Sequence, residues 1–312
     1  MITAKIIQDS AHTTFGVEQR VTTFELEYPR FIHSELMTHR VFSRNAASSR
    51  AIPIDKMLDM VSTYPAMPEV WGLNQAGMQA TKVGGYFKRK VGEWAWKKAA
   101  KVAVKSARLL QRLGFHKQIV NRVVEPFSHI KVVVTATNFD NWLWLRSHKD
   151  AQPEIRILSD KMWDLYNDSE PTALKEGEYH VPYVTRLRNP LGKLIYCTGI
   201  GGEPLTTKEA IKVSASCCAQ VSYRVLDESL KKALKIYKSL VESVPVHASP
   251  FEHQATPIPQ GAFKLWLAGY QEDSPEGITH CDRQGFLWSG NFKGWIQNRQ
   301  LIKNNVCTKY EP

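Results

Sequence analysis

The sequence predicts an α+β fold in which a mixed or antiparallel sheet is flanked by helices. Two stretches have the character of strands: residues 21–28 alternate between apolar and polar side chains, and residues 130–137 are mostly β-branched. Three further stretches repeat apolar residues every three or four positions, as amphipathic helices do. These expected helices cover residues 94–113, 155–165 and 227–241. At 312 residues, the chain is long enough to bury a sizeable core.

The strand expected at 21–28 leads into a segment with helical spacing. The apolar side chains on one face of this strand are Phe24, Leu26 and Tyr28. Pro29 ends or bends the strand, because proline has no N–H to donate to a sheet. Apolar residues in 31–40 then recur at roughly helical spacing, which brings His39 and Arg40 to the end of an ordered element. The polar loop that follows is therefore expected to be anchored by a core-facing segment.

The helix expected at 94–113 has one basic face. Lysines and arginines recur along it at spacings of three and four, opposite alanine, valine and leucine positions. These residues are Lys97, Lys101, Lys105, Arg108 and Arg112. Such a stripe is usually a solvated face, and contact with a nucleic acid or another polyanion is the less favoured interpretation.

The second half of the chain gives weaker patterns. Residues 171–190 are typical of a loop, and the glycines at 199–202 lack both the G-x-G-x-x-G spacing and the following helix of a dinucleotide-binding fold. A Rossmann fold is therefore discarded. The helix at 227–241 is expected to begin with Asp227 as its N-cap. A strand, a turn and a last helix are expected at 262–268, 289–295 and 296–302, respectively.

Charge and composition narrow the class of protein. The chain carries 41 basic and 30 acidic side chains, a formal charge of +11, which attracts anionic partners from nucleotides to nucleic acid. Apolar residues make up 43% of the chain, which is ordinary for a globular protein. No apolar run is long enough to span a bilayer, and the first residues lack the pattern of a signal peptide. We therefore expect a cytoplasmic protein with no membrane partner.

The cysteines do not form a recognisable framework. Their number is odd, and their spacing matches neither a complete set of disulfides nor a zinc site. They are Cys197, Cys217, Cys218, Cys281 and Cys307. We expect free thiols and no bound metal.

One stretch of twelve residues, 39–50, concentrates groups that bind anions. It contains a histidine, three arginines, three serines and an asparagine, and its small residues at 46–49 let backbone amides approach a ligand. Guanidinium groups combined with backbone amides are typical of a phosphate site. A helix end followed by a solvated basic loop has the same composition, so composition alone leaves both interpretations open.

Three other stretches carry short polar patterns. Residues 145–155 contain Leu-Arg, then Ala-Gln and Glu-Ile, and residues 218–223 read Cys-Ala-Gln-Val-Ser-Tyr. Residues 249–253 read Ser-Pro-Phe-Glu-His, which predicts a capping box at a helix start: Ser249 caps an amide and Glu252 reaches back three residues. Taken singly, each stretch is also explained by an ordinary helix end or a surface ion pair.

Together, the four stretches resemble the flavin-dependent thymidylate synthases. The signature of that family reads Arg-His-Arg, seven residues and Ser, with an Asn and a final Arg at the places held here by Asn45 and Arg50. The other three stretches resemble the family's Leu-Arg with Ala-Gln-x-Glu-Ile, its Ala-Arg-Val-Ser and its Ser/Thr-Pro-Phe-Glu-His segments. The resemblance implies that residues 1–312 form a single catalytic domain with that family's fold.

The resemblance also implies roles for the matching residues. The substrate nucleotide would be bound by Ser48, Ser49, Arg50, Arg122, Arg146 and Gln152. The flavin would be lined by His39, Arg40, Ser43, Asn45, Asn141, Ser222, Ser249 and Glu252. The candidate catalytic residues are Arg146, which would stabilise charge that develops near the uracil ring, and Ser48. Because no histidine or aspartate is tied to Ser48 in the sequence, we assign it to the substrate phosphate rather than to a nucleophile.

The sequence departs from the family pattern in composition and in order. Thr38 and Gln220 stand where the family usually has arginines, and Ala46 stands where it often has a glutamate. The 218–223 and 249–253 stretches follow the 39–50 stretch, whereas in compact bacterial members they precede it. The order of motifs is thus permuted, and the four stretches must converge in space if the resemblance is functional.

The family's reaction makes dTMP from dUMP, with FAD as cofactor and with methylenetetrahydrofolate and NADPH as co-substrates. Its members are homotetramers with shared active sites, and the same assembly is expected here. A related flavin enzyme that modifies another pyrimidine nucleotide is one alternative, motivated by the three departures. A basic nucleic-acid-binding protein without catalysis and an inactive structural relative are the others.

Overall fold

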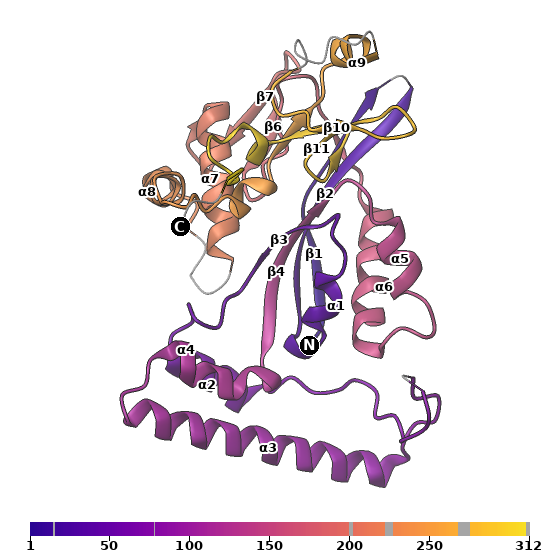
Figure 1. The fold of residues 1–312 in the computed structure, drawn as a ribbon, viewed down its shortest axis with the longest axis vertical. Coiled ribbons are helices and arrows are strands. Elements are labelled where there is room, and N and C mark those ends of the chain that lie inside the picture. Colours follow the sequence, from indigo (N-terminus) through magenta and orange to yellow (C-terminus); the bar gives the residue numbers. More distant parts are fainter. Residues whose placement is uncertain (15, 78, 200–201, 222–226, 268–274, 310–312) are drawn as a thin grey trace.

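A computed structural model of the chain describes residues 1–14, 16–77, 79–199, 202–221, 227–267 and 275–309. Its centre is a five-stranded sheet with the strand order β3-β4-β2-β1-β5 (Figure 1). The strands are β1 (Thr3–Thr14), β2 (Val17–Pro29), β3 (Ser43–Ala46), β4 (His129–Ala136) and β5 (Thr172–Ala173). All neighbouring pairs are antiparallel except β1 and β5, so the sheet is mixed. This sheet, flanked by helices, confirms the predicted fold class.

The predicted strand face of β2 forms the main core. Phe24, Leu26 and Tyr28 are fully buried in one cluster with alternate residues of β4, including Val132 and Val134. Because side chains alternate across a strand, Thr23 and Thr135 lie on the opposite face of the sheet. Three elements cover the apolar face: α1 (His33–Met37), α5 (Asp140–Arg146) and α6 (Pro153–Asp168).

A helical region lies below the sheet in Figure 1. It contains the 3-10 helices η1 (Arg30–Ile32) and η2 (Asn121–Phe127), α2 (Ile54–Thr63), α3 (Tyr86–Arg112) and α4 (Lys117–Val120). The predicted helix at 94–113 is the second part of α3, which begins eight residues earlier. Its buried residues Ala100, Val104 and Ala107 share a core cluster with α2.

The C-terminal part of the chain packs on the other face of the sheet. A three-stranded sheet consists of β6 (Thr185–Arg188), β7 (Leu194–Cys197) and β8 (Pro204–Leu205). Its helices are α7 (Thr207–Gln220), α8 (Leu230–Val241) and α9 (Gln260–Leu267), with the 3-10 helices η3 (Ser249–Glu252) and η4 (Asn298–Leu301). The remaining strands are β9 (Ala255–Pro257), β10 (His280–Cys281), β11 (Leu287–Ser289), β12 (Phe292–Lys293) and β13 (Trp295–Gln297).

Several sequence predictions in this part were wrong. The strand predicted at 262–268 begins inside helix α9, because a short apolar run does not distinguish a buried strand from a helix. The helix predicted at 296–302 is instead strand β13 followed by the short η4. Residues 171–190, predicted as loop, contain the short strands β5 and β6.

The predicted N-cap of α8 was also wrong. Ser229, not Asp227, caps the helix, since its hydroxyl oxygen accepts a hydrogen bond from the Lys232 amide. Asp227 accepts from the Ser229 amide instead and so supports the cap from outside the helix.

Candidate active site

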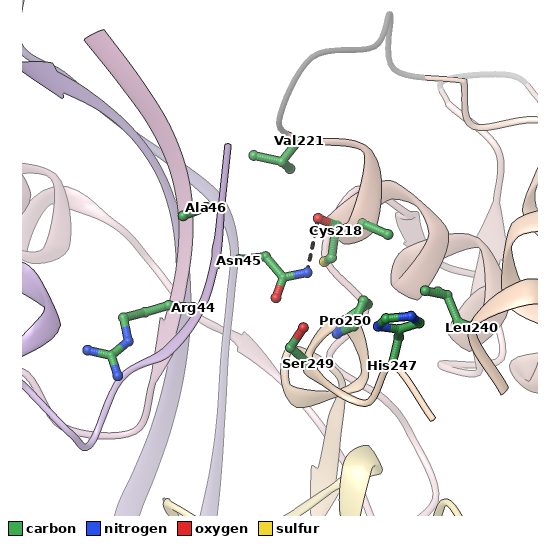
Figure 2. Close-up of a pocket in the computed structure, with 10 residues that line it drawn as sticks. Arg44, Asn45, Ala46, Cys218, Val221, Leu240, His247, Ser249 and Pro250 are labelled. Atoms are coloured by element: carbon green, nitrogen blue, oxygen red, sulfur yellow. Dashed lines mark hydrogen bonds between the residues drawn. The ribbon is translucent and has the colours of Figure 1, made fainter. Parts of the chain in front are cut away.

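Three of the four motif stretches meet at one cavity of about 280 Å³. Strand β3 lines one side of it, the end of α7 a second side and η3 a third (Figure 2). The lining residues are Arg44, Asn45, Ala46, Cys218, Ala219, Val221, Leu240, His247, Ser249 and Pro250. Segments separated by about 200 positions in the sequence therefore come together, as the resemblance requires.

Asn45 links two of these walls and leaves one polar atom unused. Its Nδ2 donates to the backbone oxygen of Cys218 at 3.3 Å. Its Oδ1 is buried and accepts no hydrogen bond from the part of the chain that the structure describes. A buried amide oxygen without a donor costs about 1–3 kcal/mol, so a ligand N–H or O–H that reached it would relieve that cost.

Arg44 stabilises the turn between α1 and β3. In Figure 2 its side chain lies on the opposite side of β3 from that of Asn45. Its Nη1 donates to the backbone oxygens of Leu36, Met37 and His39, at 3.3, 2.9 and 3.2 Å. A cation at the C-terminal end of α1 satisfies the open carbonyls there and complements the helix dipole. Arg44 thus fixes the turn that carries His39.

Arg146 brings the second motif stretch to the first. Its Nε donates to His39 Nε2 at 3.1 Å, its Nη1 pairs with Glu35 at 2.9 Å, and its Nη2 donates to the Thr38 hydroxyl at 3.2 Å. All four motif stretches therefore converge. Because Nε2 accepts, His39 is neutral and carries its proton on Nδ1.

The neutral state of His39 has a physical cause. Burial is the largest contribution, followed by the charges of Arg146 and Arg44, and together they lower the pKa of His39 to about 4. The ring is 5% exposed and packs edge-on against Trp142. This predicted flavin residue therefore holds Arg146 in place.

A second carboxylate, Glu125, holds several predicted phosphate ligands. It accepts a hydrogen bond from Ser49 and pairs with Arg122 at 3.1 Å and with Arg30 at 3.5 Å. Ser49 is buried, whereas Arg50 is exposed and has no ion pair among the described residues. An incoming phosphate would have to displace Glu125 from Ser49 and Arg122.

The remaining predicted residues that the structure describes do not line this cavity. Ser48 is half-buried, and Arg40 and Asn141 are exposed. Gln152 donates to Glu154 at 3.1 Å rather than pointing to an open site. Ser222 lies outside the described residues.

The C-terminal segment ties down two predicted flavin contacts. Ser43 is fully buried, and its hydroxyl oxygen accepts from Asn291 at 3.0 Å and from Gln297 at 3.1 Å. Glu252 pairs with Arg299. Sequence patterns gave no signal for these distant partners.

The predicted capping box at 249–253 was wrong. Ser249 makes no side-chain cap in η3, and the exposed residue instead faces the cavity. The segment is a single 3-10 turn whose N-cap is Ala248, so Ser249 is not at the N-cap position, and Glu252 pairs with Arg299 instead of completing a box.

A buried chain of hydrogen bonds crosses the sheet from β1 to β4 and continues to His253. Ser10 contacts His180 Nδ1 at 2.7 Å, His180 Nε2 contacts Thr23 at 2.8 Å, Thr23 contacts Thr135 at 2.7 Å, and Thr135 contacts His253 Nδ1 at 2.8 Å. All five side chains are buried. The chain ends at the last residue of the fourth motif stretch.

Arg186 sets the direction of this chain. It donates to the Ser10 oxygen at 2.7 Å, which leaves the Ser10 hydroxyl proton for His180. His180 Nε2 then donates to Thr23, the Thr23 hydroxyl donates to Thr135, and the Thr135 hydroxyl donates to His253 Nδ1. His253 therefore carries its proton on Nε2. That Nε2 is buried and has no partner among the described residues. Burial lowers the pKa of His253 to about 3 and that of His180 well below its usual value.

Comparison with known families agrees with this geometry. The sequence model described as "Thymidylate synthase complementing protein" matches residues 2–172, which is more than half of the chain. The chain belongs to this family. The match includes the 39–50 and 145–155 stretches, and it ends before the 218–223 and 249–253 stretches. This confirms the resemblance inferred from the motifs.

Solved structures similar to this family member share little sequence with it. Two are of the UMP/dUMP methylase PolB from Streptomyces cacaoi, bound with 5-Br UMP or 5-Br dUMP, at 17% and 18% identity and TM-scores of 0.45 and 0.43. Each covers 53% of this chain, and 88% or 90% of the PolB chain. A third is thymidylate synthase X from Helicobacter pylori with FAD and dUMP, at 16% identity, 47% and 67% coverage and a TM-score of 0.35. No curated protein matches the chain.

The departures from the family pattern have local explanations. Thr38 accepts from Arg146, so a hydroxyl stands where an arginine would crowd that guanidinium. Ala46 lies at the wall of the cavity. Gln220 is 2% exposed and donates to Ser216 and to the Asp227 backbone, which a charged arginine would do only at a desolvation cost.

The described residues fit a flavin in part. The buried, unpartnered oxygen of Asn45 and the hydroxyl of the exposed Ser249 belong to residues that line the cavity, and they would offer an acceptor and a donor to polar edges of a ligand. A cavity of 280 Å³ is at the low end of the roughly 300–1,000 Å³ typical of ligand pockets, so it would enclose only one portion of a dinucleotide. Within the described ranges, no three His, Cys, Asp or Glu side chains are placed to hold a metal ion.

No helix among the described residues is both long and apolar enough to cross a membrane.

Proposed function

We propose that this protein is a flavin-dependent thymidylate synthase, which converts dUMP to dTMP with methylenetetrahydrofolate and NADPH as co-substrates. The observation that carries the proposal is the convergence of the four motif stretches, with the open Asn45 oxygen at the cavity where three of them meet. The proposal treats residues 1–312 as one catalytic domain, because the contacts of the site extend from Glu35 to Arg299.

The nucleotide would be bound by the basic side of the site. Arg50 has no ion pair among the described residues, so it is available to a phosphate without rearrangement. Arg122 and Ser49 now contact Glu125, and the phosphate would replace that carboxylate as their partner. Arg146, held by His39 and Glu35, would present a fixed positive charge where negative charge develops on the pyrimidine ring.

The flavin would be held on the other side, by Asn45 and Ser249. When bound, it supplies the redox chemistry that reduces the transferred one-carbon unit, with electrons that NADPH provides. Asn45 would accept a hydrogen bond from the flavin, and Ser249 would donate one. Neutral His39 would keep Arg146 oriented between the two ligands.

The small cavity favours a site completed by another subunit. A dinucleotide larger than 280 Å³ must extend beyond the described walls, and a second copy of the chain would cover the remainder. We therefore also propose a homotetramer with shared active sites, the assembly that the family resemblance implies.

A related flavin enzyme that acts on another pyrimidine nucleotide is the second candidate. The replacement of two family arginines by Thr38 and Gln220 is the observation that favours it, since lost charges near the ligands alter which substituents a site accepts. Both candidates use the same flavin and differ in the nucleotide.

The visible absorption spectrum of the purified protein tests the proposal. We expect flavin bands, added or intrinsic, that bleach with NADPH, and turnover of dUMP to dTMP when the folate is present. Turnover of UMP instead of dUMP would support the second candidate. A protein that neither carries nor accepts FAD would refute both.

One variant pair tests the assigned cofactor contact. Asn45→Leu removes the open acceptor and should weaken FAD binding by about 5- to 100-fold, because a ligand donor would then be buried without a partner. The matched control is Asn189→Leu, which removes an amide oxygen that accepts from the Leu191 and Lys193 amides and is not part of the cavity wall. Equal effects of the two changes on FAD affinity would show that Asn45 has no direct contact.

A further inference from the structure

Helix α3 carries most of the protein's net charge. Its 27 residues include nine lysines and arginines and one acidic residue, a net charge of +8, whereas the whole chain has +11. The helix runs along the outer edge of the molecule in Figure 1, away from the cavity described above. Only Ala100, Val104 and Ala107 are fully buried along it. Most of the surface of α3 is therefore exposed and strongly positive.

Few of these charges are neutralised within the protein. Glu93 pairs with Arg89 and Lys90, and these two ion pairs account for the helix's own acidic residue. The other seven basic residues have no carboxylate within ion-pair distance in the part of the chain that the structure describes. They are Lys88, Lys97, Lys98, Lys101, Lys105, Arg108 and Arg112. These like charges repel one another along the helix, and a bound polyanion would remove that repulsion.

Exposed aromatic rings accompany the charges. Phe87 is 79% exposed and Trp94 is 62% exposed, although burial is the usual state of such rings. The ammonium group of Lys98 lies 5.0 Å from the centre of the Trp94 ring. An exposed indole beside a lysine offers a stacking surface next to a cation.

The aromatic and basic residues lie on the same face of the helix. Five helical turns contain 18 residues, so positions 18 apart point in the same direction. Phe87 and Lys105 form one such pair, and Trp94 and Arg112 form another. Phe87 and Trp94 lie toward the N-terminal end of this face, and Lys98, Lys105 and Arg112 continue it toward the C-terminal end. An interfacial membrane helix has the opposite arrangement, with aromatic and basic residues segregated on different faces.

We propose that the exposed face of α3 binds single-stranded nucleic acid. Its cations would contact successive phosphates, and Phe87 and Trp94 would stack on unpaired bases. A second copy of α3 does not suit this face, because two helices of charge +8 repel each other. A duplex suits it less, because the bases of a duplex are already stacked and leave the rings without a partner. This binding surface is separate from the proposed active site.

Fluorescence anisotropy with a labelled oligo(dT) strand tests this proposal. The full-length protein should bind with an affinity that falls steeply as salt rises, because phosphate contacts release counterions. The triple change Lys98→Glu, Lys105→Glu and Arg112→Glu should abolish the binding at moderate salt. Neutral changes of the same three residues to Gln should lower the slope of log K against log salt by about 2, since each contact with a single strand contributes about 0.7.

A matched control separates α3 from overall charge. Lys208, Lys231 and Lys235 are exposed lysines on α7 and α8. Their joint change to Glu alters the net charge by the same amount and should leave most of the affinity intact. Equal losses in both triple variants would refute a surface on α3. Circular dichroism and size-exclusion chromatography of each variant report whether it has kept its fold and its assembly.

The stacking contribution has its own test. Trp94→Ala should weaken oligo(dT) binding by about 5- to 100-fold, because stacking of one base contributes about 1–3 kcal/mol. Trp94→Phe should recover most of that affinity, whereas a purely electrostatic surface would respond to neither change. An RNA strand of the same length would show whether sugar chemistry matters. Tighter binding to a duplex, or binding to anionic lipid vesicles but not to oligo(dT), would overturn the proposal.

Discussion

Two groups of basic residues in this protein have opposite surroundings. At the site, Arg44 is held by three backbone oxygens, Arg146 by Glu35 and His39, and Arg122 by Glu125. On α3, seven of nine basic residues have no acidic partner among the described residues. The sequence alone does not show which of these basic residues have partners.

The difference separates two uses of positive charge. A guanidinium that is held by several acceptors points in one direction and presents its charge at one place, which suits the binding of one small molecule in one pose. Unpaired cations along an exposed helix can adjust to a ligand of variable shape, which suits a flexible polymer. Removing a basic residue should therefore harm the first group and relieve the second, and the following experiments examine that contrast.

The largest effect is expected at Arg146. Arg146→Ala should lower kcat/KM of the proposed reaction by about 10²- to 10³-fold, the usual loss when a donor to developing charge is removed. Arg146→Lys should recover little, because an ammonium group cannot contact His39, Glu35 and Thr38 together. Steady-state kinetics measures both effects.

Histidine NMR distinguishes this role of Arg146 from a structural one. Burial and then the Arg146 charge lower the pKa of His39, so Arg146→Ala should raise that pKa toward its usual value. A variant with normal activity and a shifted His39 pKa would contradict the proposed role in catalysis. A variant that loses activity only because it unfolds would be recognised by the loss of chemical-shift dispersion, with all its histidines titrating near their usual pKa.

A smaller effect, on stability, is expected at Arg44. Arg44→Met should reduce the free energy of unfolding by about 2–3 kcal/mol, because three carbonyl oxygens at the end of α1 lose a charged donor. Arg44→Lys should recover part of the loss. Urea denaturation gives the value, and an unchanged free energy of unfolding would mean that water satisfies these carbonyls equally well.

The sequence predicted the central elements of the fold well. The alternation at 21–28 and the β-branched run at 130–137 are each long enough to define a strand, and both stretches lie in the central sheet. The apolar run at 262–268 was misassigned because so short a run fits a helix or a strand equally. Helix α7 was not predicted, since its small buried residues give little contrast between its faces.

For the candidate site, the sequence identified the motif residues but not the residues that hold them in place. Four short patterns identified the residues that converge, but the partners that hold them come from elsewhere in the chain. Glu125 and Arg299 are examples: neither belongs to a motif, yet one binds Ser49 and the other binds Glu252. Contacts of this kind depend on the packing of distant segments, which no local pattern encodes. The distinction between held and unpaired arginines likewise required the structure.

Acid should lower the free energy of unfolding, because several buried histidines are neutral in the folded protein. Burial lowers the pKa values of His39 and His129 to about 4 and that of His253 to about 3, so the unfolded chain binds protons near pH 6.5 that the folded chain does not. The free energy of unfolding should therefore decrease as pH falls from 6.5 toward 4, by about 1.4 kcal/mol per pH unit for each fully responsive histidine.

Thermal unfolding at several pH values, with and without added salt, measures this dependence. His253→Asn removes one of the titrating groups and should flatten the profile. A stability that is constant between pH 6.5 and 4.5 would mean that these rings are already protonated or solvated. Because α3 contains no histidine, its oligo(dT) binding should depend mainly on salt over the same range.

The smallest effect is expected on α3, and its sign is opposite. Lys101 lies four residues from both Lys97 and Lys105, and like charges at this spacing destabilise a helix by about 0.2–0.5 kcal/mol per pair. Lys101→Gln should therefore raise the free energy of unfolding by about 0.5 kcal/mol at low salt, and the gain should disappear in high salt, where such repulsions are screened. Urea denaturation at two salt concentrations measures it, and a loss of stability at low salt would show that Lys101 has a stabilising partner. A gain on α3 beside a loss at Arg44 would establish that unpaired and held charges contribute to stability with opposite signs, as expected if α3 tolerates its charge for a ligand.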